Sequence, residues 1–251
     1  EHGLADWQDY FQQYPPSRDD KYRGPQYERG MLTWDLPEHL HHSHWIADRT
    51  VANIEQSVKG GKPFFAWASF FDPHPPYVVP DPWASMYEPS DMVPGQFTEG
   101  EFDDMPPQFA KTREENPDFS TYQEEGGKAL HGFNSHLHSD DDLRNSIACY
   151  YGMISLMDQA IGRILDSLDT LGITDNTLVV FTTDHGHFLG QHGLIAKGAF
   201  HYEDLLRLPM IARYPGHIPA DTTSDALQAL IDYPSTFLTA AGIKPPGLMQ
   251  G

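Results

Sequence analysis

The sequence has little cysteine, little basic charge and no long apolar run. Its 251 residues contain a single cysteine, Cys149, which excludes an internal disulfide framework and a cysteine-rich zinc site. Only 16 Lys and Arg residues stand against 36 Asp and Glu residues, and the formal net charge is −20. Such an acidic surface repels nucleic acid and anionic membranes, so we expect neither as a partner. The apolar run at 64–71 (FFAWASFF) is far too short to span a membrane.

Signals of targeting are also missing from the ends of the chain. It begins at Glu1 without a Met, a basic region or an apolar leader stretch, and it stops in GLMQG without an evident terminal element. We therefore expect either a processed product or a piece of a longer protein, and these residues do not answer whether a signal peptide exists.

Apolar periodicity predicts alternating helices and strands. The predicted helices are residues 38–58, 142–171 and 223–241. The predicted strands are residues 63–71, 177–183 and 208–214. This alternation predicts an α/β fold with a mainly parallel sheet that helices cover on both faces.

A long irregular stretch separates the first predicted strand from the second predicted helix. Residues 72–140 are rich in Pro, Gly, Asp and Glu and show little periodicity. A loop of this length in a compact domain usually carries function or is partly disordered. Because specificity resides on loops over a rigid scaffold, we expect substrate contacts here, including the histidine-rich segment 131–138.

Two of the predicted strands lead into polar loops that contain histidine. Residues 63–71 run into DPHPP, which contains His74, and residues 177–183 run into DHG, which contains Asp184 and His185. In open α/β sheets, ligands bind outside the carboxyl ends of the strands. We therefore expect these side chains to converge on one crevice.

The residue types of this crevice suit a divalent cation and an anion. Asp184 offers an oxygen and His185 a nitrogen, and both can reach one Lewis-acidic metal if the backbone bends at Gly186. Lys197 supplies a point charge that suits a tetrahedral anion. His74 can protonate a leaving alkoxide, because imidazole ionises near neutral pH.

Each motif taken alone also has a simpler interpretation. Asp-His at a strand end is often a capping turn, DPHPP is more often a rigid surface turn, and a lysine after a glycine-rich loop is usually solvated. Four histidines lie at the start of the first predicted helix, and no carboxylate or cysteine completes a recognisable ligand spacing with them, so no metal role is expected. They are His39, His41, His42 and His44.

The motifs together resemble the sulfatase family of the alkaline phosphatase superfamily. The resemblance covers roughly residues 38–80 and 143–245, and its specific part runs from the second predicted helix through DHGHFLGQHG to Lys197. It implies an alkaline-phosphatase-like fold, in which residues 1–251 form the middle-to-late part of one catalytic domain. Residues 72–140 would then be a loop insertion on the substrate side.

The resemblance also implies roles for individual residues. Asp184 and His185 would bind one divalent metal ion, usually Ca²⁺, with Mg²⁺, Mn²⁺ and Zn²⁺ as alternatives because the second position is commonly Asn. His74 and Lys197 would contact the sulfate and take part in catalysis, and His192 would be a further substrate contact. The implied activity is hydrolysis of a small-molecule or glycan sulfate ester, and the resemblance favours a periplasmic or secreted location.

The nucleophile of the family is missing from this sequence. Sulfatases convert a Cys or Ser in a C/S-x-P-x-R signature into formylglycine, but YPPSR (14–18) has Tyr14 at that position. Cys149 lies in a predicted helix without the Pro or Arg and is expected in the core. We therefore expect the formylglycine and two further metal-binding acids upstream of these residues, the C-terminal part of the domain beyond them, and no turnover by residues 1–251 alone.

Three alternatives stay open from the sequence. One is a phosphonate or phosphate mono- or diester hydrolase of the same superfamily, and another is an inactive relative that binds sulfated glycans. A purely structural domain is the third, although the agreement of several motifs argues against it.

Overall fold

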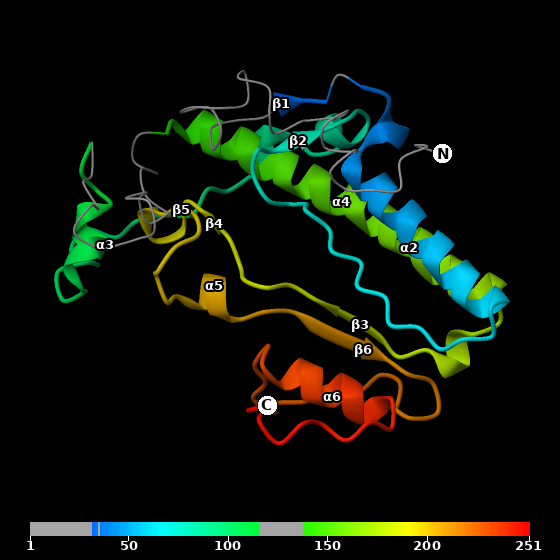
Figure 1. The fold of residues 1–251 in the computed structure, drawn as a ribbon. Coiled ribbons are helices and arrows are strands. Elements are labelled where there is room, and N and C mark those ends of the chain that lie inside the picture. The colour runs from blue at the N-terminus through cyan, green and yellow to red at the C-terminus, as the bar shows by residue number, and fades with distance from the viewer. Residues whose placement is uncertain (1–31, 35, 116–137) are drawn as a thin grey trace.

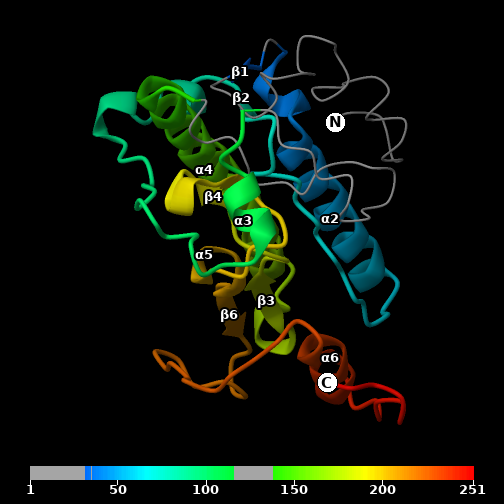
Figure 2. The same ribbon diagram turned by 90° about the vertical axis from the view of Figure 1, so that its left-hand side faces the viewer.

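The computed structural model describes residues 32–34, 36–115 and 138–251, and it is built around two long helices. Helices α2 (His42–Lys59) and α4 (Asp140–Thr170) lie side by side and pack against each other (Figure 1). Strands β3 (Val179–Thr182) and β6 (Met210–Arg213) lie between α4 and α6 (Asp232–Ala240) in both views (Figures 1 and 2). Helices therefore lie on both sides of this strand pair.

The other elements are short. The further strands are β1 (Leu32–Thr33), β2 (Val78–Val79), β4 (Phe188–Leu189) and β5 (Ile195–Ala196). The short α-helices are α3 (Pro107–Lys111) and α5 (Glu203–Leu206). Single 3₁₀ turns cover Glu38–Leu40, Trp83–Ser85, Pro89–Asp91, Thr174–Asn176 and Gln191–Gly193. Among the helices of the described ranges, none combines the length and the hydropathy that a membrane crossing requires.

Helix α4 confirms the second predicted helix, and a cap on its N-terminus explains where it begins. The Ser139 hydroxyl accepts the Asp142 N–H at 3.1 Å, and the Asp142 carboxylate accepts the Ser139 N–H at 3.1 Å. The apolar face of the helix, with Met153 and Leu156 fully enclosed, forms the main core. Gly172 follows the helix with a φ of 66°, the left-handed conformation that glycine adopts most easily.

The first part of the long irregular stretch is packed against the body of the chain. Tyr77 and Val79 join the core around α4. Phe102 and Phe109 belong to a second apolar cluster, which also contains Phe188, Leu194, Phe200 and Leu205. Residues 116–137, with nearly all of the histidine-rich segment, and the YPPSR segment lie outside the described residues.

The prediction of a buried strand at residues 63–71 is wrong. The segment is extended beside α2, but Phe65 and Trp67 are 69% and 71% exposed. It pairs with no strand in the part of the chain that the structure describes. Apolar residues dictate an extended backbone locally, whereas a ladder of hydrogen bonds also needs a neighbouring strand, and the described residues supply none here.

The other two predicted strands are confirmed, but their pairing differs from the prediction. Strands β3 and β6 run antiparallel, with Val179 opposite Arg213 and Thr182 opposite Met210. Within the described residues the one parallel pairing joins β1 and β2 over two residue pairs, so the mainly parallel sheet is not present there. The connection from β3 to β6 contains a hairpin and the four-residue helix α5 rather than the long crossover helix that usually joins parallel neighbours.

Candidate functional site

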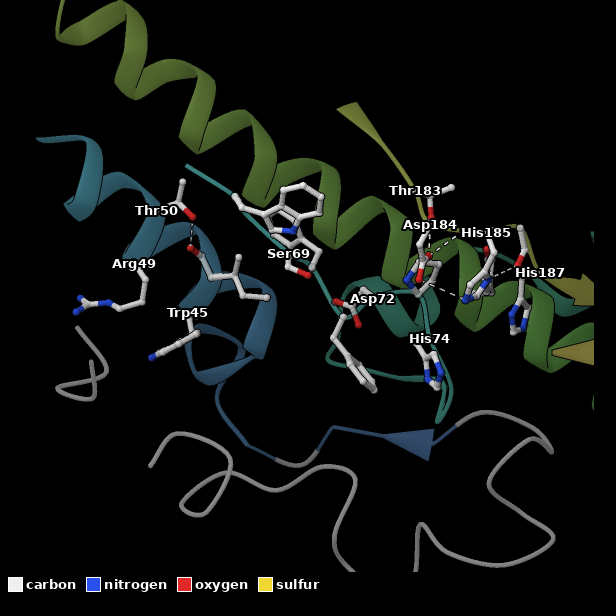
Figure 3. A pocket seen from close by; sticks show the side chains of 17 residues that line it. Trp45, Arg49, Thr50, Ser69, Asp72, His74, Thr183, Asp184, His185 and His187 are labelled. Carbon is white, nitrogen blue, oxygen red and sulfur yellow. Dashed lines mark hydrogen bonds and ion pairs between the residues drawn. The ribbon is translucent and has the colours of Figure 1, made fainter. Parts of the chain in front are cut away.

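A cavity of about 560 Å³ lies where residues 63–71 and strand β3 both end (Figure 3). It has the size of an ordinary small-molecule site. The polar residues that line it near these ends are Asp72, His74, Thr183, Asp184, His185 and His187. The prediction that His74, Asp184 and His185 share one crevice is therefore confirmed, whereas their chemical roles remain predictions.

The side chains of Asp184 and His185 face a common space. The Asp184 side chain is 80% exposed, its Oδ1 accepts the His185 N–H at 3.0 Å, and its Oδ2 lies 3.5 Å from His185 Nε2. His185 Nδ1 donates to the Gly186 carbonyl at 2.7 Å, since a carbonyl oxygen can only accept. With the proton on Nδ1, the neutral ring has its lone pair on Nε2, which is the atom that a metal ion would bind.

A close backbone contact fixes the loop that contains this pair. A Cβ atom on Gly186 would lie 1.7 Å from the carbonyl oxygen of Asp204, so a larger residue does not fit without displacing the backbone. The Gly186 N–H also donates to the Leu205 carbonyl at 3.0 Å. Glycine is required here because α5 approaches closely, and this contact anchors the loop against α5.

Lys197 directly follows β5 and contacts the loop that contains His185. Its Nζ donates to His185 Nε2 at 3.0 Å. The preceding residue, Ala196, has a φ of 60°, a conformation that is uncommon for a residue other than glycine and that is often found at functional sites. The ammonium group thus contacts the same ring nitrogen that a metal ion would bind.

The donor set fits part of a divalent metal site. A carboxylate oxygen and an imidazole nitrogen 3.5 Å apart can share one cation at bond lengths of about 2.0–2.6 Å. Asp184 and His185 supply two donor atoms, so further ligands would have to complete the coordination of any divalent cation. Within the described ranges, no third His, Cys, Asp or Glu completes a ligand group with them.

His74 lies in a tight turn directly after the extended segment. Its N–H donates to the Phe71 carbonyl at 3.0 Å, and its Nδ1 donates to the Pro75 carbonyl at 2.6 Å. The second contact assigns a proton to Nδ1, because the carbonyl has none to give. Nε2 is therefore the ring atom through which His74 can exchange a proton with a ligand.

His187, which the sequence patterns did not single out, also lines the cavity. The Tyr77 hydroxyl donates to His187 Nε2 at 2.5 Å, and the His187 ring stacks on Tyr150 with ring centroids 5.4 Å apart. Burial lowers the pKa of His187 to about 3, and neighbouring basic groups add to the shift, so the ring is neutral at neutral pH. The second histidine of DHGH was the one signal of its presence.

His192, the further substrate contact that the resemblance implied, is absent from the lining of this cavity. Its Nδ1 contacts the Glu101 carboxylate, its Nε2 lies 3.2 Å from Asp204 Oδ2, and its ring stacks on Tyr202 at 3.6 Å. Burial alone would raise the pKa of Glu101, but hydrogen bonds from His192 and from the Thr98 N–H outweigh it and lower that pKa. His192 thus joins separate segments of the chain, and its contact with substrate remains a prediction.

Cys149 is a core residue, as the sequence predicted. Its side chain is completely buried in the cluster around α4. Burial raises the pKa of this thiol to about 12, and the nearby Asp72 carboxylate acts in the same direction. A thiol with that pKa does not form the thiolate that a nucleophile requires.

Comparisons with known proteins point to one family. The sulfatase family model matches residues 2–243 of the chain. The chain is similar to an N-acetylglucosamine-6-O-sulfatase of Bacteroides thetaiotaomicron, with 43% identity over 102 residues that cover 41% of this chain and 18% of that protein. It is also similar to an arylsulfatase of Clostridium perfringens, with 28% identity over 221 residues that cover 87% of this chain and 42% of that protein.

One solved structure shares the fold of this chain over nearly its whole length. A phosphonate monoester hydrolase from Silicibacter pomeroyi superimposes with a TM-score of 0.70 and 24% identity, over 98% of this chain and 48% of that one. At this identity the similarity concerns the fold. The chain spans less than half of the length of each of these three proteins.

Proposed function

The chain belongs to the sulfatase family, and we propose that the full-length protein hydrolyses a sulfate ester in the cavity described above. The observation that supports this proposal is that His74, Asp184 and His185 line one cavity at the ends of two extended segments, and that Lys197 contacts His185 without lining the cavity itself. The net charge of −20 does not favour binding of an anion, so an anion site requires a local group of this kind.

Lys197 is proposed to bind the sulfuryl oxygens. Its ammonium contacts His185 Nε2, and with a metal ion on that nitrogen the ammonium would instead donate to the oxygens of the substrate. A positioned charge of this kind stabilises the negative charge that grows on the oxygens in the transition state, and its loss typically costs about 10²–10³-fold in rate.

Asp184 and His185 are proposed to hold the divalent metal ion of the family. Such an ion supplies Lewis-acid chemistry and withdraws charge from the reacting oxygens. The contribution of the chain is orientation, because the Gly186 carbonyl holds the His185 ring with Nε2 toward the Asp184 carboxylate. The identity of the metal remains part of the proposal.

His74 is proposed to give a proton to the leaving oxygen. Its Nδ1 is engaged by the Pro75 carbonyl, so Nε2 is the atom that delivers the proton. The nucleophile is expected outside residues 1–251, in the form of the formylglycine that the family resemblance implies, because the buried Cys149 is unsuitable. The proposal therefore concerns the full-length protein, and its periplasmic or secreted location stays a prediction.

A sulfated sugar is the substrate class that the cavity suits best. Aromatic side chains line the cavity beside the polar groups, and their flat apolar faces suit the apolar face of a sugar ring. They include Trp45, Trp67 and Tyr150. The name of the Bacteroides thetaiotaomicron relative, an N-acetylglucosamine-6-O-sulfatase, supports an amino-sugar sulfate.

The test is a substrate panel with the full-length protein. N-acetylglucosamine 6-sulfate, 4-nitrophenyl sulfate and a phenyl phosphonate monoester would be compared by kcat/KM, with Lys197→Ala as the variant. We expect the highest kcat/KM for a sulfate ester and a large loss in the variant. Preference for the phosphonate ester would favour the other hydrolase class, and binding of the sulfated sugar without turnover would indicate an inactive relative.

A further inference from the structure

A second group of potential metal ligands lies where the N-terminus of α2 meets the turn after residues 63–71. His41, His42 and Asp72 each place one ligand atom within 4.8 Å of the others. Their exposed fractions are 0%, 4% and 5%, so the group is enclosed by the protein. Among the described residues it is the one set of three or more His, Cys, Asp or Glu side chains with this geometry. Figure 3 shows Asp72 beside the first turns of α2.

The hydrogen bonds of His41 place its lone pair on Nδ1, the ring atom that lies near Asp72. His41 Nε2 donates to the Val78 carbonyl at 3.3 Å, which assigns the proton of the ring to Nε2. His41 Nδ1 accepts the Ser43 N–H at 3.3 Å, which agrees with a lone pair on that atom. The same Nδ1 lies 3.8 Å from Asp72 Oδ2. Each of these two acceptor atoms takes a hydrogen bond from Ser43, and a cation between them would replace both bonds.

The charge of Asp72 is compensated by hydrogen bonds from His42 and Ser43 rather than by a cationic Lys or Arg side chain. Burial alone would raise the pKa of this carboxyl, but His42, His41 and the Ser43 hydroxyl outweigh it and lower that pKa, so the group is ionised at neutral pH. Burial, followed by the effect of His42, lowers the pKa of His41 to about 3, so this ring is neutral. In the part of the chain that the structure describes, no Lys or Arg forms an ion pair with Asp72. A buried carboxylate normally requires a paired charge or a metal.

The distances within the group suit a small divalent cation. His42 Nε2 and Asp72 Oδ1 form a hydrogen bond of 2.7 Å, whose proton a bound metal ion would displace, and His41 Nδ1 lies 3.8 Å from Asp72 Oδ2. Ligands of a tetrahedral Zn²⁺, with bonds of about 2.0–2.2 Å, lie roughly 3.4 Å apart, which falls between these two values. Two imidazole nitrogens and one carboxylate oxygen also form a ligand set that zinc commonly takes.

We propose that His41, His42 and Asp72 bind a zinc-like divalent cation, at a site separate from Asp184 and His185. Three protein ligands leave a fourth position for a water molecule or the Ser43 hydroxyl, which already contacts Asp72. The site joins the first residues of α2 to Asp72, two residues before His74. Metal binding here therefore stabilises the turn that positions His74, and its primary role is structural.

The experiment measures metal binding by the full-length protein, independently of activity. The protein would be prepared as Asp184→Asn, which removes a ligand of the other proposed site, and then stripped with a chelator and titrated with Zn²⁺ or Co²⁺. Elemental analysis gives the stoichiometry, and the visible absorption of Co²⁺ reports tetrahedral coordination. His41→Gln would be added as the test, and His44→Gln as the matched control. His44 is equally close to the start of α2, but it pairs with Glu38 instead.

We expect one bound metal ion in the Asp184→Asn protein and a retained ion with His44→Gln. With His41→Gln the affinity should fall by at least about 100-fold, the upper end of what the loss of a supporting partner costs. Equal metal content in folded His41→Gln and His44→Gln proteins would overturn the proposal. If His41→Gln fails to fold, the Co²⁺ spectrum of the Asp184→Asn protein decides, and the absence of tetrahedral bands would overturn it as well.

Discussion

The two aspartate–histidine groups of this chain differ most in their exposure to solvent. The Asp184 side chain is 80% exposed and lies beside His185, which accepts a hydrogen bond from Lys197. The Asp72 side chain is 0% exposed and is surrounded by histidines and a serine hydroxyl. An exposed carboxylate is available to exchange a metal and meet a substrate, whereas an enclosed one chiefly affects the free energy of unfolding. Asp72 and Asp184 line the same cavity, yet we expect the first to act on stability and the second on metal and substrate binding.

The largest expected effect is on stability and follows from this difference. Asp72→Asn should lower the free energy of unfolding by roughly 3 kcal/mol, because it leaves buried histidines without their charged partner. Asp184→Asn should change it by less than about 0.5 kcal/mol, as is usual for an exposed side chain. Urea unfolding of the two variants measures both values. Equal destabilisation by the two substitutions would remove the distinction between the groups.

Lys197→Ala tests the exposed group through activity. We expect kcat/KM for a sulfate ester to fall by about 10²–10³-fold, since a preorganised charge is lost from the cavity. Lys197→Arg should recover part of the loss, because a planar guanidinium is a poor copy of a point charge.

A salt series sharpens the same test. At ~0.15 M salt the Debye length is ~8 Å, so the diffuse repulsion from the acidic surface is screened before the contacts inside the cavity. The loss caused by Lys197→Ala should therefore persist as salt is raised. Wild-type kinetics of Lys197→Ala at every salt concentration would show that Lys197 is an ordinary solvated residue.

His74→Ala separates proton donation from binding. Esters with poor leaving groups should lose about 100-fold in kcat/KM, and activated aryl esters should lose much less, if His74 protonates the leaving oxygen. The measurement is a leaving-group series for wild type and variant. Losses of equal size across the series would assign His74 to binding of the sulfate alone.

The last expected effect concerns the pH dependence of stability. In the protein stripped of metal, the pKa of His41 falls from 6.5 to about 3 on folding, so the unfolded chain binds more protons between these values. The free energy of unfolding should therefore decrease as the pH is lowered through this window, by at most about 1.4 kcal/mol per pH unit for each such group. His187 contributes in the same direction. His41→Gln should flatten the profile between about pH 6.5 and 3, whereas an unchanged slope relative to His44→Gln would contradict the assignment.

The part of the site that is contiguous in sequence was predictable. Asp184 and His185 are neighbours in a loop that follows a recognisable strand, and Lys197 comes soon after them. Adjacent residues must lie close together in any fold, so the pattern alone was sufficient to bring these groups into one hypothesis.

The buried group could not be predicted in this way. Asp72 lies 30 residues from His42 in the sequence, and no spacing rule joins them. The carboxylate that the histidines lacked in the sequence is supplied by the turn after residues 63–71. Tertiary packing also determines His187, whose ring lies against Tyr150 of α4.

In the fold, too, features set by residues close in sequence were predictable, whereas features set by contacts between distant segments were not. The start of α4 follows from the capping pair Ser139 and Asp142, which are three residues apart. The extended form of residues 63–71 follows from the local pattern as well. The absence of a ladder partner for this segment within the described residues, and the antiparallel pairing of β3 with β6, depend on which strands are neighbours. Periodicity contains no information on neighbours.

The most direct test of the account is the response of the full-length protein to Asp184→Asn. Divalent-metal affinity and sulfate-ester turnover would be measured on the same preparations of wild type and variant. The account predicts that both fall together while the urea midpoint in the presence of a chelator stays unchanged, because Asp184 is exposed and acts through a ligand. Wild-type turnover with unchanged metal affinity in the Asp184→Asn protein would contradict it.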